Sequence, residues 1–248
     1  MTNVFDVRDL HVRYQTFEAV KGVSFTVAKG EIFGIVGESG SGKSTIAKTL
    51  IGLEKPSAGE IVRSQDVVQM IFQDAVGSLN PRMTVRATLE EAARFARARR
   101  RAETRRDRPA AGELLDRVGL SQAVLDQYPR EMSGGQCQRV SIARALAAGG
   151  DVLIADEPVS ALDVSVQARV LNLLRDLRRE LGLTILLIAH DLAVVKNVCD
   201  RVAVMEKGRF VDFGPAEDVF LNPQSDYTKR LLAAVPDVAR GLAARHDA

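Results

Sequence analysis

Apolar residues recur along this 248-residue chain in two patterns, short continuous runs and helical repeats. Largely apolar runs at residues 32–36, 152–155 and 184–189 predict strands that are buried on both faces. Apolar residues spaced by three and four positions after residue 44 and across 170–181 predict helices with one buried face. Strands and helices in this alternation predict an α/β fold with a mainly parallel sheet.

The N-terminal segment has a different pattern. Apolar and polar residues alternate in runs at 4–7, 10–14 and 23–27, which predict a half-solvated antiparallel sheet with turns near Asp9 and at 28–30. Later segments predict strands at 60–63 and 67–72, a helical region rich in alanine and arginine at 85–120, and a closing hairpin at 202–213. The segment after Pro215 is expected to be helical and then irregular past Pro236.

The first continuous run leads into a glycine-rich loop. Residues 37–44 read GESGSGKS and match G-x-x-x-x-G-K-[ST] at every fixed position, between a predicted strand and a predicted helix. The glycines let backbone N–H groups turn toward one anion, and the helix start adds its own unpaired N–H groups. Lys43 can reach the β- and γ-phosphates, and the Ser44 hydroxyl can ligate Mg²⁺. The pattern predicts a nucleoside triphosphate site made of Gly37, Glu38, Ser39, Gly40, Ser41, Gly42, Lys43, Ser44 and Thr45.

Polar residues end the other predicted strands. Asp156 ends the run DVLIAD, where it can hold Mg²⁺ beside Ser44, and Glu157 follows where it can orient or deprotonate water. His190 ends the strand at 184–189, and Gln73 follows the strand at 67–72. A lone histidine is more often structural, but ligands of an open α/β sheet bind at this edge, so we expect His190 at the site.

Two further features have alternative interpretations. Tyr14 ends a strand upstream of the loop, where a tyrosine is either an ordinary core or surface residue or a stacking partner for adenine. The segment MSGGQ at 132–136 is either only a helix cap and turn, with Ser133 as the N-cap, or a second anion site. A tight loop at 160–163 then precedes the long helix.

Composition and charge exclude few classes of function. A net charge of +2 indicates no particular partner, and Cys137 and Cys199 have no metal-ligand spacing. Eight arginines between Arg94 and Arg108 are either a nucleic-acid patch or a solvated helical face. We expect the solvated face and no nucleic-acid partner, since Glu103 and Asp107 partly balance the charge. Neither a transmembrane run nor a signal peptide is apparent, so a cytoplasmic location is expected.

The motifs together resemble the ATP-binding-cassette (ABC) ATPases. GESGSGKS, Gln73, MSGGQ, DVLIADE, SALD and His190 occur in the order and at about the spacing of that family, over about residues 4–235. Residues 236–248 are left as a loose C-terminal tail. The resemblance implies a P-loop NTPase core with an N-terminal antiparallel β-subdomain and a helical subdomain at about 85–127. It also implies ATP and Mg²⁺ as cofactors, and ATP hydrolysis that drives transport.

The resemblance implies a role for each site residue. In the family, two cassettes pair head to tail around two ATP molecules. The signature residues of one subunit would contact the γ-phosphate that is held by Lys43 of the other, and Asp163 would link the two sites. Glu157 would be the base, His190 would hold the γ-phosphate and water, and Tyr14 would stack on adenine. The signature residues are Ser133, Gly134, Gly135 and Gln136, and the implied metal ligands are Ser44, Gln73 and Asp156.

Two segments narrow the resemblance to a group of importers. QDAVGSLNPRMTV at 73–85 and NPQSDYTKRLLAAVP at 222–236 look like the oligopeptide, dipeptide and nickel importers. The group implies a second, non-identical ATPase, two membrane permease subunits and an extracytoplasmic binding protein, with this chain peripheral on the cytoplasmic side of the plasma membrane. Short peptides and nickel or metal chelates both remain open as cargo. The alternative, a non-transport ABC ATPase of DNA repair or of the ribosome, is disfavoured because sustained heptads and a second phosphate-loop motif are absent from the sequence.

Overall fold

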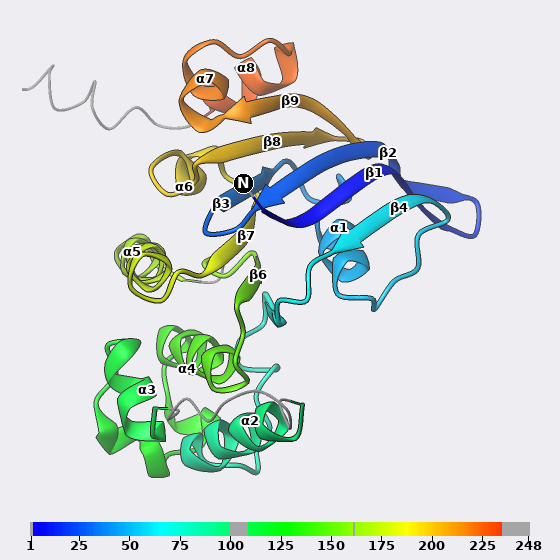
Figure 1. Cartoon of the computed structure of the whole chain (residues 1–248). Helices are drawn as coiled ribbons and strands as arrows, with labels where there is room; N and C mark the ends of the chain where they lie inside the picture. The colour runs from blue at the N-terminus through cyan, green and yellow to red at the C-terminus, as the bar shows by residue number, and fades with distance from the viewer. Residues whose placement is uncertain (1, 100–108, 161, 235–248) are drawn as a thin grey trace, which may run out of the picture.

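The computed structural model describes residues 2–99, 109–160 and 162–234. The chain forms two sheets with helices around them (Figure 1). A three-stranded antiparallel sheet has the order β2-β1-β4, and a six-stranded sheet has the order β5-β6-β7-β3-β8-β9. The larger sheet is parallel except for β9, which pairs antiparallel with β8. The predicted α/β fold with a separate antiparallel sheet is therefore confirmed.

The helices and strands follow the predicted order. The strands are β1 (Asn3–Tyr14), β2 (Phe17–Ala28), β3 (Ile32–Val36), β4 (Ala58–Arg63), β5 (Val68–Ile71), β6 (Val152–Asp156), β7 (Thr184–Ala189), β8 (Arg201–Glu206) and β9 (Arg209–Pro215). The helices are α1 (Lys43–Leu50), α2 (Val85–Arg99), α3 (Ala111–Arg117), α4 (Gly134–Ala147), α5 (Val164–Leu181), α6 (Leu192–Lys196), α7 (Ala216–Leu221) and α8 (Asp226–Ala233), with 3-10 turns η1 (Gln122–Asp126) and η2 (Pro129–Glu131).

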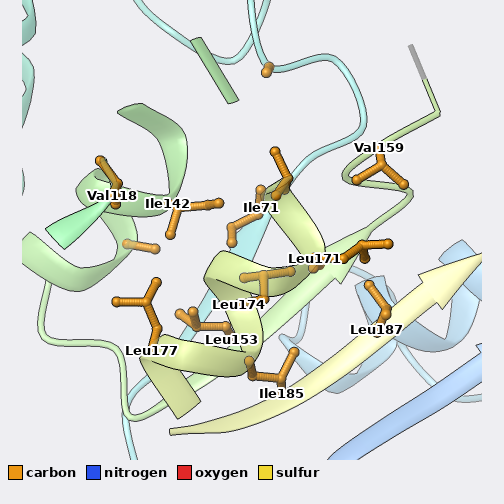
Figure 2. Packing of buried hydrophobic residues seen from close by; sticks show 14 of the residues in the cluster. Ile71, Val118, Ile142, Leu153, Val159, Leu171, Leu174, Leu177, Ile185 and Leu187 are labelled. Carbon is orange, nitrogen blue, oxygen red and sulfur yellow. The ribbon is translucent and has the colours of Figure 1, made fainter. Parts of the chain in front are cut away.

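The central strands are apolar throughout because both faces of the larger sheet are covered. Phe33 and Ile35 of β3 belong to the core shared with α1 and the antiparallel sheet, whereas Ile32 and Val36 belong to the core on the opposite face. In that second core, α5 packs over β6 and β7, as Figure 2 shows for Leu174, Leu153 and Ile185. The strand ends that carry the predicted polar residues are held in place by this two-sided burial.

The first strand differs from the prediction, because β1 runs through Asp9 without a turn. Asp9 has a φ of 45°, and the register with β2 shifts between Val7 and Leu10, which is a β-bulge. The Asp9 N–H donates to the Ser24 hydroxyl at 2.9 Å, so the displaced backbone group keeps a partner. The hairpin turn comes at residues 15–16 instead.

The helical region lies at one end of the molecule. Helices α2 and α3 both pack against α4, and Figure 1 shows the three as a group below the sheets. Residues 100–108, which hold most of the arginine run, and residues 235–248, which include the predicted tail, lie outside the described residues. Within the described ranges, no helix is long and apolar enough to cross a membrane.

Candidate functional site

The predicted phosphate loop opens onto a pocket of about 520 Å³. The pocket lies where β3 and β6 end and α1 begins, so it occupies the carboxyl edge of the parallel sheet. It gathers residues from widely separated segments. Its lining comprises Tyr14, Phe17, Ala19, Glu38, Ser39, Gly40, Gly42, Lys43, Ser44, Thr45, Gln73, Glu157 and His190.

Two glycines of the loop are required by close packing. A methyl group on Gly37 would lie 2.1 Å from the Met205 carbonyl oxygen, and one on Gly42 would lie 2.4 Å from the Ala19 carbonyl oxygen. Gly42 also has a φ of 111°, which disfavours any residue with a side chain. The loop is therefore seated directly on β8 and β2, with no room for a side chain at these two positions.

Lys43 is buried at the base of the loop, with 3% of its side chain exposed. Its Nζ donates to the carbonyl oxygens of Gly37 at 2.7 Å and Glu38 at 2.8 Å. Burial lowers the pKa of Lys43, and the carboxylates of Glu157 and Asp156 oppose that shift. A buried ammonium group that donates to two carbonyl oxygens can also bind an anion, which suits the phosphates of a nucleotide.

Ser44 and Asp156, both predicted to hold Mg²⁺, are in direct contact. The Ser44 hydroxyl donates to Asp156 Oδ1 at 2.9 Å, and Asp156 is 6% exposed. Burial raises the pKa of Asp156, the hydrogen bond from Ser44 opposes the shift, and the Glu157 carboxylate adds to it. No cluster of three or more His, Cys, Asp or Glu that could hold a metal occurs among the described residues. One carboxylate and one hydroxyl nevertheless fit Mg²⁺, which takes few protein ligands and completes its shell with phosphate oxygens and water.

Glu157 lies at the centre of the polar residues. Its carboxylate lies 3.9 Å from Lys43 Nζ and 3.6 Å from His190 Nδ1, and it accepts a hydrogen bond of 3.3 Å from Gln73 Nε2. Glu157 also has a φ of 47°, an uncommon conformation for a residue with a side chain. The structure therefore brings Gln73, Lys43, Glu157 and His190 together from four separate segments.

Tyr14 lies at the rim of the pocket, and Phe17 lies beside it. The two residues pair across the hairpin turn of β1 and β2, and 39% of Tyr14 and 61% of Phe17 are exposed. Burial of the phenol group nevertheless raises the pKa of Tyr14. Sequence reasoning missed Phe17, although its spacing of three residues from Tyr14 across a two-residue turn was a usable signal.

The signature segment lies outside this pocket. Ser133 caps α4, since its hydroxyl accepts the Gln136 N–H at 3.3 Å, and the Gln136 side chain accepts the Ser133 N–H at 2.8 Å. A methyl group on Gly135 would come within 2.8 Å of Val166 of α5. Asp163 caps α5 by accepting the Val166 N–H at 3.0 Å. The two helix starts thus form a second polar surface, which Gly134 shares and which is separate from the residues lining the pocket.

Comparison with known proteins identifies the family. Residues 20–160 match the family model described as ABC transporter. The chain is 45% identical, over 96% of its length and 82% of the relative, to an oligopeptide transport ATP-binding protein, OppF, of Lactococcus lactis.

Solved structures give the same result. The chain resembles cbiO1 of Clostridium perfringens, part of an ABC transporter complex, with a TM-score of 0.77 and 27% identity over 98% of this chain and 100% of the other. It also resembles a dimeric ATP-binding cassette bound to ADP and Pi, with a TM-score of 0.72 and 28% identity over 86% of this chain and 98% of the other. The chain therefore belongs to the ABC transporter family, as an ATP-binding and ATP-hydrolysing cassette.

Proposed function

We propose that this chain powers the uptake of short peptides by hydrolysing ATP on the cytoplasmic side of a membrane importer. The observation that carries the proposal is the position of Glu157, within contact distance of Lys43, Gln73 and His190 at the mouth of the phosphate loop. The similarity to an oligopeptide transport ATP-binding protein supports peptides as the cargo.

Each residue of the pocket would have a separate role in ATP binding and hydrolysis. Lys43 and the loop N–H groups would bind the β- and γ-phosphates, and Tyr14 would cover the adenine. Bound Mg²⁺ would supply charge compensation at the phosphates, with Ser44, Asp156 and Gln73 as its protein ligands. Glu157 would accept a proton from the attacking water, and His190 would orient that water and the γ-phosphate. Gln73 donates to Glu157 through Nε2, which leaves its amide oxygen available for the metal.

A complete site requires a second cassette. Ser133, Gly134, Gly135 and Gln136 lie on their own surface beside Asp163 rather than in the pocket of the same chain. A head-to-tail pair would bring this surface to the γ-phosphate of the partner, with Asp163 near the boundary. The dimeric cassette with ADP and Pi supports pairing of two cassettes, and a non-identical partner ATPase remains our expectation.

The membrane subunits would dock in an apolar groove. A hollow of about 600 Å³ between β5 and α2 is lined by Leu53, Phe72 and Phe95, of which Phe95 is 72% exposed. Arg144 of α4 donates to the Ser78 carbonyl oxygen at 2.6 Å and so holds the segment after Gln73 against this groove. A permease helix that presses on the groove would thereby reach both Gln73 and the helix that carries Ser133. We expect two permease subunits and an extracytoplasmic binding protein.

Uptake of labelled peptide by cells that lack this gene tests the proposal. Uptake should be lost and should return with the wild-type gene, but not with Lys43→Ala. Lys207→Ala, at an exposed lysine, should restore uptake and serves as the matched control. Uptake of labelled nickel chelate is measured in parallel. Unchanged peptide uptake in the deletion strain would overturn the peptide assignment, and loss of chelate uptake alone would replace it with the metal cargo.

A further inference from the structure

The C-terminal part of the chain reaches the phosphate loop through one side chain. The hydroxyl of Tyr227, in α8, accepts the backbone N–H of Glu38 at 2.9 Å, across a separation of 189 residues. Tyr227 is 5% exposed, so its ring is fixed by packing and its hydroxyl points at the loop from the protein interior. None of the nucleotide-site motifs includes this residue.

Tyr227 is itself held firmly in place. Asp212 of β9 accepts the N–H groups of Gln224 and Ser225, each at 3.0 Å, immediately before α8. Ser225 then caps the helix by accepting the Thr228 N–H at 3.0 Å. Since β9 pairs with β8 in the larger sheet, these contacts tie the start of α8 to the body of the protein. The hydroxyl of Tyr227 therefore has little freedom to follow a moving loop.

The carbonyl group of Glu38 contacts the rest of the phosphate loop and Lys43. The Glu38 carbonyl oxygen accepts both Lys43 Nζ at 2.8 Å and the Ser41 N–H at 3.2 Å. The N–H of Glu38 is thus held by α8 while its carbonyl holds the first turn of the loop and the phosphate-binding lysine. A shift of the peptide unit before Glu38 would be passed to Ser41 and Lys43.

We propose that Tyr227 is a positioning residue for the phosphate loop. Its hydroxyl fixes the Glu38 peptide so that Lys43 and the loop N–H groups are already arranged for phosphate before nucleotide binds. Preorganisation of this kind raises affinity because less conformational entropy of the loop is lost when the ligand binds. The proposal rests on the proposed function, because the bound phosphate chain is taken to be that of ATP.

Tyr227→Phe tests the proposal, because it removes only the hydroxyl. We expect the affinity of the purified protein for ATP and for inorganic tripolyphosphate to fall by the same factor, about 2- to 12-fold, the loss for one hydrogen bond. The KM for ATP should rise by that factor while kcat stays within about twofold. Tyr128→Phe, in the helical region, is the matched control and should leave both affinities unchanged.

Hydrogen exchange separates positioning from a general loss of stability. In Tyr227→Phe, the Glu38 amide should exchange faster while the amides of β3 keep their wild-type protection. Unchanged binding of ATP and tripolyphosphate, with unchanged exchange at Glu38, would overturn the positioning role and leave the proposed function intact. Failure of the wild-type protein to bind ATP would overturn the proposed function itself.

Discussion

In the proposed mechanism, Glu157 is the side chain on which hydrolysis depends most directly. Glu157→Gln keeps the size of the side chain and its contact with Gln73 but removes the carboxylate that would accept a proton. We expect steady-state ATP hydrolysis to fall by at least about 100-fold while ATP affinity changes little, because a general base contributes at least that factor. Glu217→Gln, at an exposed glutamate, is the control. A wild-type rate for Glu157→Gln would show that another group activates the water.

Asp156 makes the nucleotide-free protein less stable as the pH rises. Its raised pKa means that the ionised carboxylate is disfavoured in the fold, so stability is greatest below its ordinary pKa and is lost as the pH rises through the raised value. Near neutral pH, Asp156→Asn should raise Tm by about 2–4 °C, the shift for about 1 kcal/mol in a chain of this size. The increase in Tm should become smaller at acidic pH, where Asp156 of the wild-type protein is protonated.

Asp66→Asn is the matched control with the opposite sign. Burial tends to raise the pKa of Asp66, but the hydrogen bonds from Ser64 and Lys29 and the charge of Lys29 lower it overall. Ionised Asp66 therefore stabilises the fold, and its substitution should lower Tm near neutral pH. Equal shifts for the two variants in thermal melts would contradict the assigned effect of burial on Asp156.

Phe17 should contribute to nucleotide affinity through the base. An exposed phenylalanine beside Tyr14 gives the pocket a second aromatic surface, and base–aromatic stacking is worth about 1–3 kcal/mol. Phe17→Ala should weaken ATP binding by about 5- to 150-fold in calorimetry but leave tripolyphosphate binding unchanged. Phe95→Ala, at an exposed phenylalanine of the docking groove, controls for lost apolar surface. Equal losses for ATP and tripolyphosphate would place the effect on the loop instead.

Among the helices, α4 begins with the signature segment, which we propose acts on the nucleotide bound by the partner cassette. Ser133→Arg removes a cap and places a long cation on the surface that would face the partner's γ-phosphate. Hydrolysis should fall to background, while ATP binding by the monomer stays within about twofold, and the lost cap should cost about 1 kcal/mol of stability. Ser121→Arg, at the exposed cap of η1, loses a similar cap at a residue outside the motifs and should retain activity. Lost ATP binding in monomeric Ser133→Arg would contradict the head-to-tail arrangement.

Local patterns predicted the helices and strands well where one physical cause dominates. The strands β3, β6 and β7 are continuously apolar because both faces are buried, and Asp163 and Gly182 bound α5 through a side-chain cap and a φ of 67°. Asp9 misled the prediction because an isolated aspartate in a strand resembles a turn, whereas the hydroxyl of Ser24 satisfies its displaced N–H. Whether a bulge or a turn forms depends on that partner strand.

The site was predictable to the extent that its residues lie in compact motifs. The phosphate loop, Asp156 and Glu157 could be placed because each lies at the end of a buried strand. The hydrogen bond between Glu38 and Tyr227 could not, because residues 189 positions apart meet only through the packing of α8 on the sheet. Phe17 is an intermediate case. Its pairing with Tyr14 is local in the sequence, but it depends on a turn at residues 15–16 whose position was not predicted.

For the whole molecule, the separation of the Lys43 pocket from the Ser133 surface predicts how ATP hydrolysis depends on protein concentration. If each site takes Lys43 from one cassette and Ser133 from another, dilute protein hydrolyses ATP only when two chains meet. Specific activity, measured with this chain and its partner cassette at equal concentrations, should then rise about twofold for each doubling of concentration and level off once pairing saturates. Activity per chain that stays constant over a 100-fold dilution range would mean that one chain contains the complete site.

The place of β3 in the larger sheet has a consequence during synthesis. Its neighbours there are β7 and β8, which begin about 150 and 170 residues later in the chain. At the usual rates of synthesis, about 5–20 residues per second, this fully apolar strand waits about 8–30 s before the first of these neighbours is synthesised. Until then, β3 is an exposed apolar strand whose backbone N–H and C=O groups are unpaired, and we expect chaperones to cover it. Stalled or truncated chains that end before β7 should therefore aggregate rather than accumulate as a folded N-terminal half.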